Sequence, residues 1–318
     1  MQQHIKLNQN NNNIRLILTE NCNASCPHCF NANVRNSKNV MDVKIYEKFI
    51  SNIYNEKDKF DAIKLMGGEP TLHPNINDFI KISYQYAHSV ILFTNGKALN
   101  KVDSKLLKEV DVVINSYTLD EKTFMETSKY KKIFSIHNVI RMEDPYNFIE
   151  KLKKFITLKS ISSNSFVIIS PDTSVNIWDK DIKRKYQEVY TSALKKFLDE
   201  IYFEVPNINF KYDHLFPACF FDQHYINLLE NKSILNSQKN YQLGCCSNNS
   251  YDCLIDTDFN IWYCNQCREQ IGRAIKKDGS FINSKEYIDI INTSRSKRNE
   301  WINIREECKM CGVKDLCK

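Results

Sequence analysis

The sequence has no apolar run that approaches the roughly 18 to 20 residues needed to cross a bilayer. Its N-terminus, MQQHIKLNQNNNN, has neither the basic segment nor the apolar segment of a secretory signal peptide. No block of lysine or arginine is long enough to form a nucleic-acid-binding arm, although the formal net charge is +6. These absences exclude the secreted and membrane-spanning classes, and they predict a cytoplasmic protein that binds neither membranes nor nucleic acid.

Cysteine, in contrast, is abundant, with 12 residues among 318. Cytosolic thiols are kept reduced, so clustered cysteines in such a protein are more often metal ligands than disulfide partners. One cluster comprises Cys22, Cys26 and Cys29, and most of the other cysteines follow residue 244. The sequence therefore predicts two metal-bearing regions.

Apolar, β-rich runs alternate with segments of helical period between residues 14 and 202. Strands are predicted at 14–19, 62–66, 90–94, 110–115, 133–140 and 166–170, and helices at 42–54, 76–87, 103–109, 120–127, 147–157 and 182–202. Six consecutive βα units predict an α/β fold whose parallel sheet is closed or nearly closed into a barrel. The chemistry of such a barrel lies at the carboxyl ends of its strands.

The remaining segments differ in composition from this alternating region. Residues 1–13 are predicted to be a disordered, asparagine-rich tail, residues 14–205 the barrel, and residues 206–242 a linker without a clear period. Residues 243–318 are predicted to form a small α+β module, with a β-hairpin over 251–264 and a helix within 285–304.

The spacing of the first cysteine cluster, NCNASCPHCF at residues 21–30, suits a particular kind of metal site. Three cysteines can hold three irons of a [4Fe–4S] cluster and leave the fourth iron open to a ligand. The spacing resembles the Cys-x3-Cys-x2-Cys signature of the radical S-adenosylmethionine (SAM) superfamily, in which an aromatic residue precedes the last cysteine; His28 stands at that position. The resemblance implies a partial (β/α)6 TIM-like barrel, SAM bound at the unique iron, and a 5′-deoxyadenosyl radical that abstracts hydrogen from a substrate.

Further motifs of the same family follow the next three predicted strands. MGGEP at 66–70 is similar to the glycine-rich motif of the family, and TNG at 94–96 ends the third strand. A lone GGE would be only a turn, but its place directly after the second strand makes it specific. The resemblance implies that the glycine backbone approaches the methionine part of SAM, that the glutamate binds its ammonium group, and that polar residues of the next strands contact SAM: Gly67, Gly68, Glu69, Thr94, Asn95, Asn115 and Ser116.

The C-terminal cysteines resemble the auxiliary-cluster domains called SPASM and twitch. The resemblance implies one auxiliary [4Fe–4S] cluster on Cys246, Cys264, Cys308 and Cys311, with Cys253 and Cys317 as further candidates. A second auxiliary cluster would draw on Cys219, Cys245, Cys253 and Cys267, because the chain stops at Lys318, where a full SPASM domain supplies further cysteines. A four-cysteine zinc ribbon of Cys264, Cys267, Cys308 and Cys311 is the alternative reading of the same residues.

The family resemblance implies a peptide or protein substrate that is crosslinked, oxidised or epimerised by an oxidoreductase-type maturase. Oxidation or rearrangement of a small molecule, such as an aminocyclitol, sugar or nucleoside, is the alternative, and a non-catalytic metal-binding protein is a third. For the epimerase reading, Cys219 is the candidate hydrogen donor. Expected partners are an electron donor such as flavodoxin or ferredoxin and a separate leader-binding protein, because the signature begins at Cys22 and leaves no room upstream for a fused one.

Overall fold

A computed structural model of the chain describes residues 12–29, 31–35, 37–54, 59–127, 134–157, 166–172, 180–202, 209–212, 224–225, 227, 253–263 and 270–302. Most of the predicted tail and most of the predicted linker lie outside these ranges. Residue Asn13, predicted to belong to the tail, is the first residue of a strand.

One sheet runs through the described part of the chain. Its strands are β1 (Asn13–Thr19), β2 (Phe60–Gly67), β3 (Ala87–Thr94), β4 (Asp111–Asn115), β5 (Phe134–Ile140), β6 (Phe166–Pro171), β7 (Asn209–Tyr212), β8 (Cys253–Ile255), β9 (Asn260–Trp262) and β10 (Gln270–Arg273). The helices are α1 (Val43–Ile53), α2 (Ile76–Tyr86), α3 (Ser104–Glu109), α4 (Glu121–Thr127), α5 (Asn147–Thr157), α6 (Lys180–Phe197) and α9 (Ser284–Ile302), with short turns η1 (Pro70–Leu72), η2 (Leu99–Lys101) and η3 (Leu198–Tyr202).

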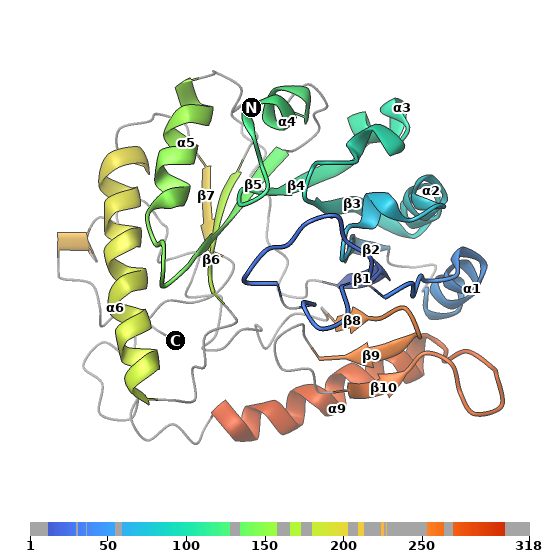
Figure 1. Ribbon diagram of the computed structural model, residues 1–318. Coiled ribbons are helices and arrows are strands. Elements are labelled where there is room, and N and C mark those ends of the chain that lie inside the picture. The colour runs from blue at the N-terminus through green and yellow to red at the C-terminus, as the bar shows by residue number, and fades with distance from the viewer. Residues whose placement is uncertain are drawn as a thin grey trace.

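The six predicted βα units are all present, and β1 to β6 pair in sequence order as parallel neighbours. The helices α1 to α6 lie along the outside of this curved sheet (Figure 1). The strand order is β10-β9-β8-β1-β2-β3-β4-β5-β6-β7, and no pairing joins its two ends among the described residues. The α/β fold with a partial parallel barrel is therefore confirmed.

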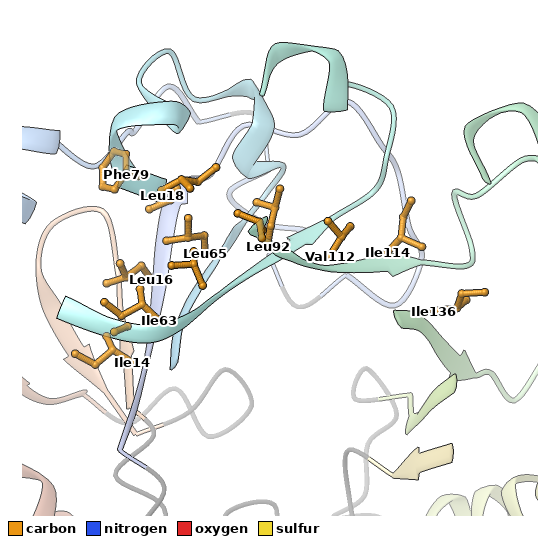
Figure 2. Close-up of a cluster of buried hydrophobic side chains, with 14 of the residues drawn as sticks. Ile14, Leu16, Leu18, Ile63, Leu65, Phe79, Leu92, Val112, Ile114 and Ile136 are labelled. Atoms are coloured by element: carbon orange, nitrogen blue, oxygen red, sulfur yellow. The ribbon is translucent and has the colours of Figure 1, made fainter. Parts of the chain in front are cut away.

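The core lies between the strands and this outer layer of helices. Ile14, Leu16 and Leu18 alternate along β1 and are each fully buried, as the period of two in a strand requires. Figure 2 shows them beside Ile63 and Leu65 of β2, in a row of apolar side chains that continues across the neighbouring strands. At the start of α1, the side chain of Asp42 accepts hydrogen bonds from Lys44 N and Ile45 N and so satisfies two of the first amides of the helix.

The region after α6 differs from the prediction in two ways. A short seventh parallel strand, β7, pairs with β6 inside the segment predicted to be a linker. The predicted hairpin is present as β8 and β9, but β8 also pairs in parallel with β1, with Ile14 opposite Cys253 and Leu16 opposite Ile255. The C-terminal strands thus extend the barrel sheet, and α9 lies beside them (Figure 1). Among the described residues, no helix combines the length and the apolar character that a membrane span requires.

Candidate iron–sulfur site at the carboxyl ends of the strands

The loop after β1 carries the first cysteine cluster. Cys22, Cys26 and Cys29 are partly buried, and Cys29 N donates a hydrogen bond to Cys26 O at 3.2 Å, which folds the last two cysteines into one turn. Burial and the charges of the other two thiols raise the pKa of Cys26 to about 11, while Lys97 and Arg35 act in the opposite direction. The three thiols are therefore close enough to influence one another.

The arrangement of these thiols fits a cluster. Within the described ranges, no group of three or more His, Cys, Asp or Glu side chains converges closely enough to hold a single metal ion. A four-iron cluster makes a different demand, because it takes one thiolate on each of three separate irons. Neighbouring thiols on one loop meet that demand, and the charges of Lys97 and Arg35 oppose part of the rise in the pKa of Cys26.

Glu69 lies at the end of β2, and its side chain is fully buried. Its Oε1 accepts hydrogen bonds from Thr71 N (3.1 Å), Thr71 Oγ1 (2.6 Å) and Thr94 Oγ1 (2.7 Å), and its Oε2 accepts one from Asn95 N (2.6 Å). Burial raises the pKa of this carboxyl, and the four donors oppose that rise. Glu69 therefore fastens the end of β2 to the end of β3, which is a role beyond the predicted contact with an ammonium group.

Asn95, directly after β3, reaches the cysteine loop. Its Nδ2 donates to Asn23 Oδ1 at 2.7 Å and to Cys22 Sγ at 3.8 Å. Three predicted site residues, Cys22, Glu69 and Asn95, are thus joined by direct contacts, although each follows a different strand.

The two glycines of the GGE motif are needed for close packing of the backbone. A Cβ on Gly68 would lie 2.3 Å from Asn21 O, and one on Gly67 would lie 2.4 Å from Thr19 O. Gly67 also has a φ of 145°, which only glycine adopts without strain. These contacts are with the last residue of β1 and the loop after it, so the glycines set the approach of that loop to β2; their predicted approach to SAM stays a prediction.

His28 and Ser116 lie on the same edge of the sheet. His28 is buried, its ring meets the Tyr117 ring edge-on at a centroid distance of 5.5 Å, and neither of its ring nitrogens has a hydrogen-bond partner among the described residues. Burial, with His137 and Arg141 adding to it, lowers the pKa of His28 to about 4. A neutral imidazole with free nitrogens in a buried place is suited to contact a bound organic group.

Sequence reasoning missed a group of residues around Tyr117. Lys151 Nζ donates to Ser116 O (3.1 Å) and Tyr117 O (3.2 Å), and it lies 5.7 Å from the Tyr117 ring centroid. The Arg141 guanidinium lies 5.9 Å from the same ring. Arg141 follows β5 directly, so a search of every strand end would have found it, whereas Lys151 belongs to α5 and no local pattern marks it.

The predicted ligands of the auxiliary cluster are mostly outside the described residues. This holds for Cys219, Cys245, Cys246, Cys264, Cys267, Cys308, Cys311 and Cys317. Cys253 is described: it is buried in β8, with its Sγ 2.9 Å from Tyr287 Oη. Cys253 therefore has the environment of a buried core residue.

A model of the family described as a 4Fe-4S single cluster domain matches residues 14–134, which hold the cysteine loop, Glu69 and Asn95. A protein of Methanocaldococcus jannaschii that provisionally bears the name glycyl-radical enzyme activating enzyme is 27% identical over 160 residues, or 44% of this chain and 62% of that protein. A GTP 3′,8-cyclase of Aliarcobacter butzleri is 30% identical over 119 residues, or 35% of this chain and 36% of the cyclase. The chain thus spans less than two thirds of either relative.

Among solved structures, SuiB of Streptococcus suis bound to its precursor peptide SuiA matches 97% of this chain and 71% of SuiB, with a TM-score of 0.64 and 18% identity. SuiB bound to S-adenosylmethionine also matches, with a TM-score of 0.59 and 14% identity. At these identities the likeness shows the fold. The family match and the relatives agree with the resemblance of the cysteine spacing to the radical SAM superfamily.

Proposed function

We propose that the chain is a radical SAM enzyme that modifies a ribosomally made peptide or a protein. A [4Fe–4S] cluster on Cys22, Cys26 and Cys29, when bound, supplies the electron that cleaves S-adenosylmethionine to methionine and a 5′-deoxyadenosyl radical, which takes a hydrogen atom from the substrate. The chain contributes the binding and orientation of these groups.

One observation carries this proposal: the cysteine loop, the GGE motif and the TNG motif are joined by direct contacts at the carboxyl ends of three adjacent parallel strands. Asn95 contacts both Cys22 and Glu69. Three motifs separated in sequence thus form one site at the edge where a barrel of this kind holds its ligands.

The residues around the loop have roles that follow from their contacts. Oε2 of Glu69 accepts one hydrogen bond, from Asn95 N, and a carboxylate oxygen has room for a second, which suits the ammonium group of SAM. His28, which is buried and has no partner for its ring nitrogens among the described residues, is proposed to contact bound SAM. Lys151 holds the backbone oxygens of Ser116 and Tyr117, which fixes the end of β4 beside that contact.

A peptide or protein is the proposed substrate class because two of the similar proteins are named for such partners. SuiB was solved with a precursor peptide, and the Methanocaldococcus relative is named as an activator of glycyl-radical enzymes. The outcome on that substrate is proposed to be crosslinking, oxidation or epimerisation. A nucleotide or other small molecule is the second candidate, and the similarity to a GTP 3′,8-cyclase favours it.

The C-terminal module is proposed to be of the SPASM or twitch type, with one auxiliary [4Fe–4S] cluster on Cys246, Cys264, Cys308 and Cys311. The proposed partners are a flavodoxin or ferredoxin that delivers the electron and a separate protein that binds the leader of the substrate. The cytoplasm is the proposed compartment, since thiols stay reduced there and remain available as cluster ligands.

Anaerobic reconstitution tests the proposal. The wild-type chain is expected to release 5′-deoxyadenosine from SAM after addition of dithionite, and a variant with Cys22, Cys26 and Cys29 all changed to alanine is expected to release none. That variant should lose about four irons per chain, the content of one cluster, and keep the iron of the auxiliary site. SAM cleavage by the triple variant, or zinc in place of iron in the wild type, would refute the proposal.

A further inference from the structure

Asn95 contacts residues that follow three other strands, and its predicted contact with SAM does not explain these contacts. Its N donates to Glu69 Oε2 after β2, and its O accepts from Thr118 Oγ1 after β4 at 3.1 Å. Its side chain reaches Asn23 and Cys22 after β1. The side chain is 6% exposed, so its polar atoms depend on these protein partners.

The orientation of the Asn95 amide is fixed by its other contacts. Oδ1 accepts a hydrogen bond from Lys97 N at 2.9 Å, which requires an acceptor on that side. Nδ2 then faces Asn23 Oδ1, an acceptor, at 2.7 Å. If the amide were flipped, donors would face a donor and acceptors an acceptor, so the N–H group must point toward the cysteine loop.

This orientation directs an N–H group to one particular sulfur. Nδ2 lies 3.8 Å from Cys22 Sγ, within the range of hydrogen bonds to sulfur. An amide donor stabilises the more negative state of a thiolate-bound cluster, because a hydrogen bond to a charged acceptor strengthens as the charge grows. Hydrogen bonds to the sulfurs are one of the features that set the reduction potential of iron–sulfur clusters.

We propose that Asn95 is a positioning residue that donates its side-chain N–H to the Cys22 thiolate and thereby raises the reduction potential of the cluster that this loop holds. This inference rests on the proposed function, since it requires a cluster on Cys22. It assigns to the asparagine of the TNG motif a contact with the cluster ligand in addition to, or in place of, a contact with SAM.

The test is a redox titration of the full chain after anaerobic reconstitution, followed by electron paramagnetic resonance. The signal of the loop cluster is isolated as the part that changes when SAM is added and that is missing from the triple cysteine variant. Asn95→Asp keeps an acceptor for Lys97 N and removes the donor, and Asn95→Ala removes both. In each variant, the ratio of reduced to oxidised cluster at a fixed potential is expected to fall about tenfold. This corresponds to a reduction potential that is lower by about 59 mV for a one-electron couple.

Two further variants separate the sulfur contact from general disturbance of the loop. Asn23→Ala removes the competing acceptor and leaves Asn95 intact, so the potential is expected to stay or rise. Asn39→Ala removes an exposed amide near the same loop, which donates to Glu20 Oε2 at 3.1 Å, and it is expected to leave the potential unchanged.

The outcomes distinguish this inference from the proposed function. If the wild type shows no SAM-responsive cluster signal, the proposed function fails. If the signal is present but the Asn95 variants keep the wild-type potential, the inference alone fails. It is also overturned if Asn23→Ala lowers the potential as much as the Asn95 variants, or if both Asn95 variants lose the cluster, because Asn95 would then order the loop without tuning it.

Discussion

Replacement of Glu69 by glutamine tests whether this carboxylate holds two strand ends together. The two side chains have the same shape, so the substitution changes the hydrogen bonds and leaves the packing in place. The amide oxygen takes the position of Oε1 and keeps the three donors from Thr71 and Thr94. The amide nitrogen then takes the position of Oε2 and faces Asn95 N, which is also a donor, at 2.6 Å.

The expected magnitude follows from this single mismatch. A buried donor left without an acceptor costs about 1 to 3 kcal/mol. The other orientation of the amide places the nitrogen against Thr71 N, while the two threonine hydroxyls can turn to accept from it, so it also leaves one backbone donor without an acceptor. We therefore expect Glu69→Gln to lower the free energy of unfolding by about 1 to 3 kcal/mol.

Urea unfolding under anaerobic conditions, followed by far-ultraviolet circular dichroism, measures this loss for the full chain. Glu150→Gln is the matched control, because Glu150 is exposed and pairs with Lys153 at 3.5 Å on the surface of α5. Such a pair contributes little, so the control should stay within about 0.5 kcal/mol of wild type. A Glu69→Gln loss as small as that of the control would refute the assigned role of the carboxylate.

Two further predictions concern neighbouring residues. His73 donates from Nε2 to Met41 O and accepts at Nδ1 from Asn75 N, and burial lowers its pKa; the stabilisation from the neutral ring is therefore present above pH ~6.5 and lost as the pH falls below it. The free energy of unfolding is measured at pH 7.5 and pH 5.5. It should fall less between these values for His73→Phe than for wild type or for a control variant at exposed His88. An equal fall in all three would contradict the assigned role of the neutral His73 ring. Gly68→Ala forces a Cβ against the backbone of the cysteine loop, so we expect a loss of about 1 to 3 kcal/mol and of iron from that loop. Gly279→Ala, where no heavy atom lies within 4 Å, should keep the full iron content, and equal iron in both variants would argue against the clash.

The barrel could be predicted because its signals are local. Each of the six βα units has an apolar run followed by a helical stripe, and the structure reproduces both. β7 could not be found in this way, because its sequence NFKY has only four residues, which is too few for the alternation to mark a strand; its pairing with β6 defines it. The pairing of β8 with β1 joins Cys253 to Ile14 across most of the chain, and no local pattern contains that information.

The candidate site was predictable in its residues and not in its contacts. The cysteine loop, GGE and TNG can be read as motifs, and each follows a strand. That Glu69 accepts from Thr94 and Asn95 depends on the register of β2 against β3, in which Leu65 lies opposite Leu92 and the two strands end side by side. That register is a property of the folded sheet, so the sequence predicts which residues gather there but not which atoms meet.

Because β1 is paired on both edges, substitutions near the cysteine loop should affect the loop and leave the sheet unchanged. β1 carries the cysteine loop, and it pairs with β2 on one edge and β8 on the other, so Leu16 lies between Leu65 and Ile255. A strand paired on both sides presents no free backbone edge along that stretch, and the loop therefore starts from a fixed point. Beyond that point the loop is held by individual hydrogen bonds, including those from Glu69 N to Asn21 O at 2.8 Å and from the Asn95 amide to Cys22 Sγ. Changes at Gly68 should therefore act first on the placement of the thiols and the iron they bind, while the sheet below keeps its register.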